Sequence, residues 1–174
     1  MHTPPFTLLG RVALGTACGA GATFLMQGMM QMSGKLIPDS APPIQQDPGE
    51  FMLRKAKKAL PPSTREQIPP TIDKAAAKML HLGYGMTSGA IYGLLGPRRG
   101  NAALNGALLG LGVWAAGYLG WLPATDLMPP ITEHEPKQIA VPIVEHALFG
   151  IAVVSAYEAV ASYARRSVDT MDSA

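Results

Sequence analysis

The sequence predicts an all-α integral membrane bundle of four transmembrane helices, and three observations support this prediction. Only 15% of the 174 residues are charged, while 48% are hydrophobic. The charges lie mostly outside four apolar stretches, at about 12–37, 76–96, 102–122 and 139–164. Each stretch is long enough to cross about 30 Å of hydrocarbon at about 1.5 Å per residue. Glycines also recur within the stretches at spacings that suit close helix packing. We therefore expect one membrane domain, 1–174.

The first and third stretches contain small residues four positions apart, a spacing that lets helix backbones approach closely in lipid. The pairs are Gly15 with Gly19 and Gly106 with Gly110. We expect them to pack helices within one bundle, with homo-oligomer formation as the alternative. Around Cys18, "RVALGTACGAG" also resembles a lipoprotein signal, but the apolar run continues well past the cysteine, which favours a retained span. A single cysteine excludes an intrachain disulfide.

A polar loop, 38–75, separates the first two stretches and is rich in proline. Within it, "GEFMLRKAKKAL" places Phe51, Leu53, Ala56 and Leu60 among four cations. This pattern predicts a short amphipathic helix on the membrane surface, with a solvated loop as the alternative. The net charge of +2 is too small for a nucleic-acid surface, so the lipid bilayer is the expected partner.

The second and fourth stretches share a pattern, "HLGYGMTSGAIY" at 81–92 and "HALFGIAVVSAY" at 146–157. Its matching positions are His81 and His146, Gly85 and Gly150, and Tyr92 and Tyr157. The first and third stretches also match, because Gly-x-Gly is followed in each by a proline nineteen residues later. Together these repeats predict two helix-loop-helix units, related by a pseudo-twofold axis along the membrane normal.

Arginines flanking the stretches predict the orientation. Arg11 precedes the first stretch, Arg98 and Arg99 follow the second, and Arg165 and Arg166 follow the fourth. The positive-inside rule then puts both termini in the cytoplasm. The opposite face collects more cations in total, eight in the first loop plus Lys137, but most of these lie away from the span ends.

Three segments in order, "HLGYGMTSGAIYGLLG", "WAAGYLGWLPATDLMPP" and "EHALFGIAV", resemble the YagU-like family of small bacterial inner-membrane proteins. The resemblance covers most of the chain and is strongest from His81 to Gly150, whereas the first loop matches poorly. It implies a multi-pass protein of the bacterial inner (cytoplasmic) membrane. It also implies a link to acid tolerance, without an established reaction.

The histidines are the candidate functional residues. Offsets of four and eleven residues return to nearly the same helix face, so each histidine shares a stripe with the glycine and tyrosine of its repeat. We expect His81 and His146 at similar depth near the non-cytoplasmic edge, with Glu145, Tyr92 and Tyr157 as associated polar groups. The pair is interpreted as helix-anchoring hydrogen-bonding residues, as a pH-responsive pair, or as ligands of haem or metal.

Methionines in "MQGMMQM" add soft ligands suited to Cu(I) near the same edge, although methionine in a span is more often packing. They are Met26, Met29, Met30 and Met32. Trp121 is expected in an aromatic belt at the membrane surface. Glu158 is expected to pair with Arg98, Arg99 or Arg165.

No nucleophile-base pair, phosphate loop or carboxylate pair occurs in the sequence, so we expect a non-enzymatic protein without a bound cofactor. The leading hypothesis is a role in envelope or acid-stress physiology. The alternatives are an accessory subunit of a larger membrane protein complex, a small transporter or channel, and a haem- or copper-binding membrane protein.

Overall fold

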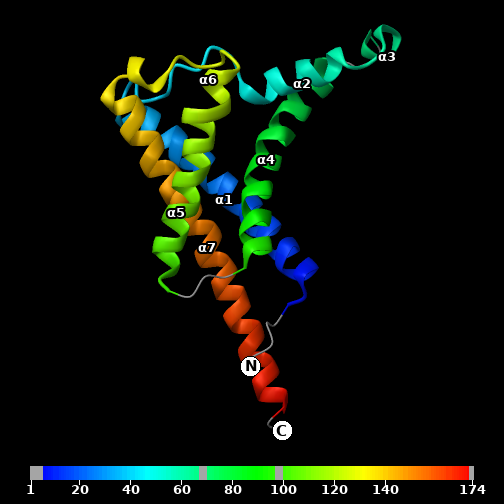
Figure 1. Ribbon diagram of the computed structural model, residues 1–174, viewed down its shortest axis with the longest axis vertical. Coiled ribbons are helices and arrows are strands. Elements are labelled where there is room, and N and C mark those ends of the chain that lie inside the picture. The colour runs from blue at the N-terminus through cyan, green and yellow to red at the C-terminus, as the bar shows by residue number, and fades with distance from the viewer. Residues whose placement is uncertain (1–5, 67–69, 97–99, 173–174) are drawn as a thin grey trace.

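Residues 6–66, 70–96 and 100–172 are described by the structure, a computed structural model, and these residues form helices and connecting loops without a strand (Figure 1). The all-α class is therefore confirmed. In chain order the elements are α1 (Leu8–Leu36), α2 (Pro48–Lys58), α3 (Pro62–Glu66), α4 (Pro70–Leu95), α5 (Ala102–Ala115), the π-helix η1 (Ala116–Trp121), α6 (Leu122–Ala124), the 3-10 helix η2 (Ile131–Glu133) and α7 (Pro136–Asp172).

Three helical stretches among the described residues are long and apolar enough to cross a membrane: Leu8–Leu36, Ala102–Ala124 and Pro136–Ser167. They correspond to the first, third and fourth expected spans, and they are the features of a multi-pass membrane protein. The second expected span lies in α4, which at 26 residues is long enough but is not among the three. Its middle carries His81, Thr87 and Ser88 between glycines, and these lower its apolar character.

The first helix pair is α1 with α4, which pack together through glycines. A Cβ atom added to Gly15 would collide with the carbonyl oxygen of Gly89, and one added to Gly19 would collide with that of Gly85. Such a close approach is open only to residues without a side chain. All four glycines are buried, so this face of α4 lies against α1.

The second helix pair, α5 with α7, also packs through glycines. A Cβ atom on Gly106 would lie 2.5 Å from Ile151 Cα, and one on Gly150 would lie 2.8 Å from Gly110 Cα. A Cβ atom on Gly110 would collide with the carbonyl oxygen of His146. The glycines expected to pack helices therefore do lie at helix contacts. The two pairs join where α1 also packs against α7.

One end of the bundle holds the start of α1, the end of α4, the start of α5 and the end of α7 (Figure 1). Here Gly96, with φ +83°, ends α4 in a left-handed conformation that favours glycine. Arg11 of α1 donates from Nε to the Gly93 carbonyl and from Nη2 to the Leu94 carbonyl, each at 3.1 Å. These bonds satisfy carbonyls that the helix end leaves unpaired.

The other end of the bundle is closed by loops and short helices (Figure 1). Helix α5 continues into η1, and Gly120 bends this segment through non-helical torsions of φ −107° and ψ −106°. Residues on both sides of the bend form a buried cluster against which Phe51 of α2 also packs: Tyr118, Leu122, Leu127 and Met128.

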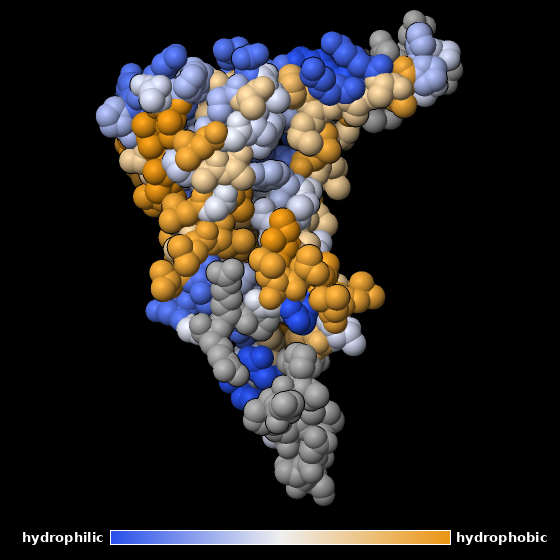
Figure 2. Space-filling model, in the orientation of Figure 1, coloured by the Kyte–Doolittle hydropathy of each residue, from blue (hydrophilic) through white to orange (hydrophobic). Residues whose placement is uncertain are grey.

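Helix α2 leaves this end sideways, away from the bundle axis (Figure 1). Asp47 caps its start, because the side chain accepts from Glu50 N at 2.9 Å. Apolar surface covers much of the middle of the bundle, while hydrophilic surface covers its loop end and the outer side of α2 (Figure 2). Helix α2 is therefore the amphipathic helix that the sequence predicts. Its more apolar side faces the apolar band around the middle of the bundle (Figure 2).

Candidate functional site

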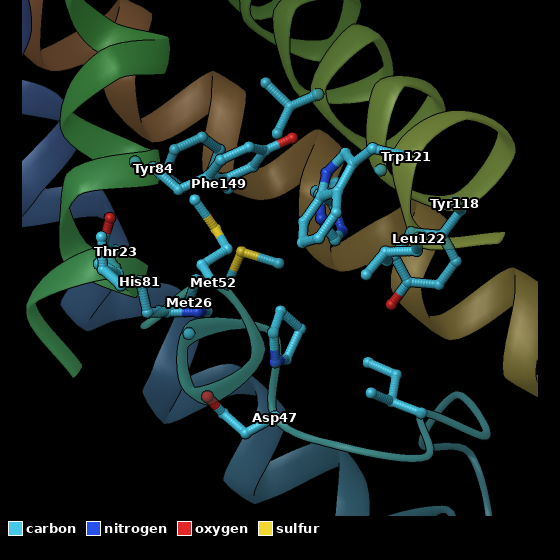
Figure 3. A pocket seen from close by; sticks show the side chains of 18 of the residues that line it. Thr23, Met26, Asp47, Met52, His81, Tyr84, Tyr118, Trp121, Leu122 and Phe149 are labelled. Atoms are coloured by element: carbon cyan, nitrogen blue, oxygen red, sulfur yellow. The ribbon is translucent and has the colours of Figure 1, made fainter. Parts of the chain in front are cut away.

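A pocket of about 250 Å³ lies inside the loop end of the bundle, between the two helix pairs. Its wall is contributed by α1, α4, the α5–η1 segment and α7, and the start of α2 covers it (Figure 3). Apolar side chains dominate the wall, among them Val113, Leu122 and Phe149. A mostly apolar cavity with a few convergent polar groups is the usual form of a small-molecule site.

Both repeat histidines line this pocket, His81 from α4 and His146 from α7. His81 is exposed and His146 is partly buried. The structure thus brings the two expected site residues to one cavity, although their chemical role stays a prediction.

The ring of His146 is held by its own helix. Nδ1 lies 2.8 Å from the carbonyl oxygen of Pro142, one helical turn earlier. Because a carbonyl oxygen only accepts, Nδ1 carries the hydrogen, and Nε2 of the neutral ring then has a free lone pair. Tyr118 packs edge-on against the imidazole, with the ring centroids 5.6 Å apart, and Trp114 stacks on Tyr118 at 5.7 Å. The imidazole is therefore fixed both by a hydrogen bond and by aromatic packing.

Glycine also shapes the pocket. Gly117 lines it, and a Cβ atom added there would meet only Leu122 Cδ1, at 3.8 Å. The missing side chain therefore leaves usable space inside the pocket. Trp121, expected only in an interfacial belt, forms part of the same wall (Figure 3).

Three methionines line the pocket: Met26 and Met30 of α1, and Met52 of α2. The thioethers of Met26 and Met52 point into it (Figure 3). Met29 and Met32, which the sequence grouped with them, are not among its lining residues. Met52 was missed because the sequence does not show that the polar loop folds back onto the bundle.

Glu145 does not line the pocket but is buried beside it in α7, with 7% of its surface exposed. Its Oε1 accepts a short hydrogen bond from Ser33 Oγ of α1. This bond links the two helix pairs at the loop end. Its position favours a structural role for the carboxylate, since a buried acid needs a hydrogen-bonding partner.

Tyr92 and Tyr157 pack together nearer the opposite end of the bundle, and neither residue lines the pocket. Their rings pack edge to face with centroids 5.2 Å apart. Tyr92 donates to Glu158 Oε1 at 3.0 Å, and Glu158 Oε2 lies 3.9 Å from Arg165 Nη2. Arg11 of α1 lies close to the hydroxyl of Tyr157.

The expected pairing of Glu158 with Arg165 is therefore present, although at 3.9 Å it is a loose ion pair. Arg98 and Arg99 lie outside the described residues. The tyrosines thus belong to a polar cluster between helices rather than to the histidine site. Within residues 6–66, 70–96 and 100–172, no group of three or more His, Cys, Asp or Glu side chains is arranged to hold a metal ion.

Comparisons with known proteins add no relative: no known protein family, curated protein or solved structure matches the chain.

Proposed function

We propose that the chain is a non-enzymatic, four-span protein of the bacterial inner membrane whose intramembrane pocket binds a small lipid-soluble molecule. The observation that carries this proposal is the pocket of about 250 Å³, which is mainly apolar and receives a histidine from each of two helices. A lipid-soluble ligand reaches such a pocket from the surrounding bilayer without leaving an apolar medium. The resemblance to the YagU-like family supports the location and a role in envelope or acid-stress physiology.

Helix α4 is the fourth span in this proposal. Its 26 residues extend about 39 Å at about 1.5 Å per residue, which exceeds the hydrocarbon thickness. Among its small and polar residues, Gly85, Ser88 and Gly89 are buried, whereas His81 and Thr87 are exposed. Lipid therefore contacts its other faces, where Ile91 and Leu94 are exposed.

Two packed helix pairs with glycine contacts support the two-unit arrangement, α1 with α4 and α5 with α7. The start of α1, the end of α4 and the end of α7 lie at one end of the bundle, and Arg11 and Arg165 near this end favour the cytoplasm (Figure 1).

Reporter fusions test the span count and the orientation. Reporters placed after Glu50 and after Arg99 should report opposite compartments, with Arg99 cytoplasmic. A cytoplasmic signal at Glu50 with an external one at Arg99 would reverse the orientation. The same compartment at both sites would remove α4 as a span.

Filling the pocket tests ligand binding. Gly117→Leu should occupy the free space, because only Leu122 lies within 4 Å of the added Cβ atom. Gly112→Leu is the matched control, since this exposed glycine of α5 has nothing within 4 Å. Thermal unfolding in lipid nanodiscs, titrated with naphthalene as an apolar probe, should show a saturable rise in midpoint for wild type and Gly112→Leu. An equal rise in Gly117→Leu would contradict binding in this pocket.

Cu(I) binding is a second candidate, favoured by the three methionines and two histidines along one pocket. Thioether and imidazole are suitable ligands for Cu(I). The double substitution Met26→Leu with Met30→Leu should then weaken Cu(I) binding, measured by competition with bicinchoninate under reducing conditions. Met29→Leu with Met32→Leu is the control, because neither residue lines the pocket. Equal binding by both double variants would exclude a methionine site here.

A further inference from the structure

The size of the pocket restricts its ligand. A cavity of roughly 150 Å³ lined by apolar side chains holds benzene. At about 250 Å³, this pocket suits two fused rings or one substituted ring. Haem, with four pyrrole rings, needs far more room than this. Tyr84, Trp121 and Phe149 lie around the space, and their rings favour an aromatic occupant (Figure 3).

The charge of the ligand is restricted as well. Among the described lining residues, Asp47 alone is acidic, and it already accepts a bond from Glu50 N at the start of α2. Lysine and arginine are absent from the described lining. A charged ligand in this mainly apolar space would have no free opposite charge to pair with, and burying an unpaired charge is energetically costly. A neutral ligand therefore fits best.

His146 specifies the polar group of the ligand. Its Nδ1 donates to Pro142, so Nε2 of the neutral imidazole accepts and does not donate. No described residue hydrogen-bonds this Nε2 atom, and it is not sealed inside protein. An acceptor on a residue that lines an apolar pocket selects a ligand that brings a donor.

Resting on the proposed function, we infer that the pocket binds a neutral aromatic alcohol of one or two rings, whose hydroxyl donates to Nε2 of His146. A membrane quinol head group and a dissolved phenol share this chemistry. A ligand with only carbonyl or ether oxygens lacks the donor and binds more weakly.

A matched ligand pair tests the hydroxyl directly. 1-Naphthol and 1-methoxynaphthalene share the two rings, but only the first donates a hydrogen bond. In nanodiscs carrying the wild-type protein, with empty nanodiscs correcting for partition into lipid, 1-naphthol should bind about 3–10-fold more tightly, the usual effect of one hydrogen bond. Equal dissociation constants for the two compounds would overturn the inferred ligand class but leave the pocket's binding function standing. Binding of neither compound would overturn both.

Histidine variants test which imidazole accepts. In His146→Leu the preference for 1-naphthol should fall to about onefold, while 1-methoxynaphthalene still binds and shows that the pocket is folded. His81→Leu removes the other imidazole of the pocket wall and tests it as the alternative acceptor. Loss of the preference in His81→Leu, with retention in His146→Leu, would contradict the assignment to His146.

Solvent extraction of protein purified from native membranes in mild detergent shows whether the bound ligand is a membrane quinol or a dissolved phenol. Recovery of an isoprenoid quinol supports the membrane source, and recovery of a short phenol supports the dissolved one. Recovery of acyl lipid alone, from wild type and Gly117→Leu equally, would contradict an aromatic alcohol as the resident ligand.

Discussion

Replacing Gly106 by alanine tests whether glycine contacts hold the second helix pair together. The added Cβ atom would lie 2.5 Å from Ile151 Cα and 2.8 Å from Ile151 N. Both are backbone atoms, so no rotamer change relieves the overlap. Because carbon atoms prefer about 3.5–4.0 Å, α5 must move away from α7 by roughly 1 Å. A gap of this size forfeits about a quarter to a half of the dispersion energy of the contacts it opens.

The expected cost of this overpacking is about 1–3 kcal/mol. Alanine also favours a helix over glycine by about 1 kcal/mol, so the informative quantity is the difference from a control. Gly112→Ala makes the same change in α5 where nothing lies within 4 Å. Gly106→Ala should be less stable than Gly112→Ala by about 1–3 kcal/mol. Unfolding in mixed micelles, followed by circular dichroism, measures this difference, and equal midpoints for the two variants would refute the reasoning.

Two further variants test the polar contacts between helices. Ser33→Ala removes the hydroxyl that donates to buried Glu145 and should cost about 1–3 kcal/mol in the free energy of unfolding, whereas Ser33→Thr, which keeps a hydroxyl, should cost less. A loss of equal size in both variants would point to packing instead. Tyr92→Phe removes the 3.0 Å bond to Glu158 and should cost about 0.5–1.5 kcal/mol, while Tyr163→Phe at an exposed site should be neutral; no difference between them in the same micelle assay would contradict a stabilising role.

Much of the helical fold was predictable because it depends on local sequence. Long uncharged runs predict helices in lipid, and the glycine spacings predict which faces pack. The glycine pairs of α1 and α5 do lie at helix contacts, with Gly19 against Gly85 and Gly106 against Gly150. The composition of α4 is more ambiguous, since the small and polar residues that let it pack against α1 also reduce its apolar character.

The pocket was not predictable in the same way, because its wall depends on how distant segments fold together. Met52 enters it only because the polar loop folds back over the bundle end. Gly117 enters it from the π-helical turn of η1, a local irregularity that hydrophobic periodicity does not reveal. The histidines are predictable because their repeated spacing is visible in the sequence, whereas the cavity that they line is not.

The repeat also explains why its two histidines are unequally buried. In the proposed two-unit arrangement, Gly19 corresponds to Gly110, but Gly19 packs against Gly85, whereas Gly110 packs against the His146 backbone. The second pair is thus shifted by one helical turn relative to the first. His146, whose ring packs against Tyr118, is partly buried, whereas His81 is exposed. A symmetric pair would present two equivalent imidazoles; this shift gives one fixed, partly buried acceptor and one accessible side chain, which favours different roles for the two.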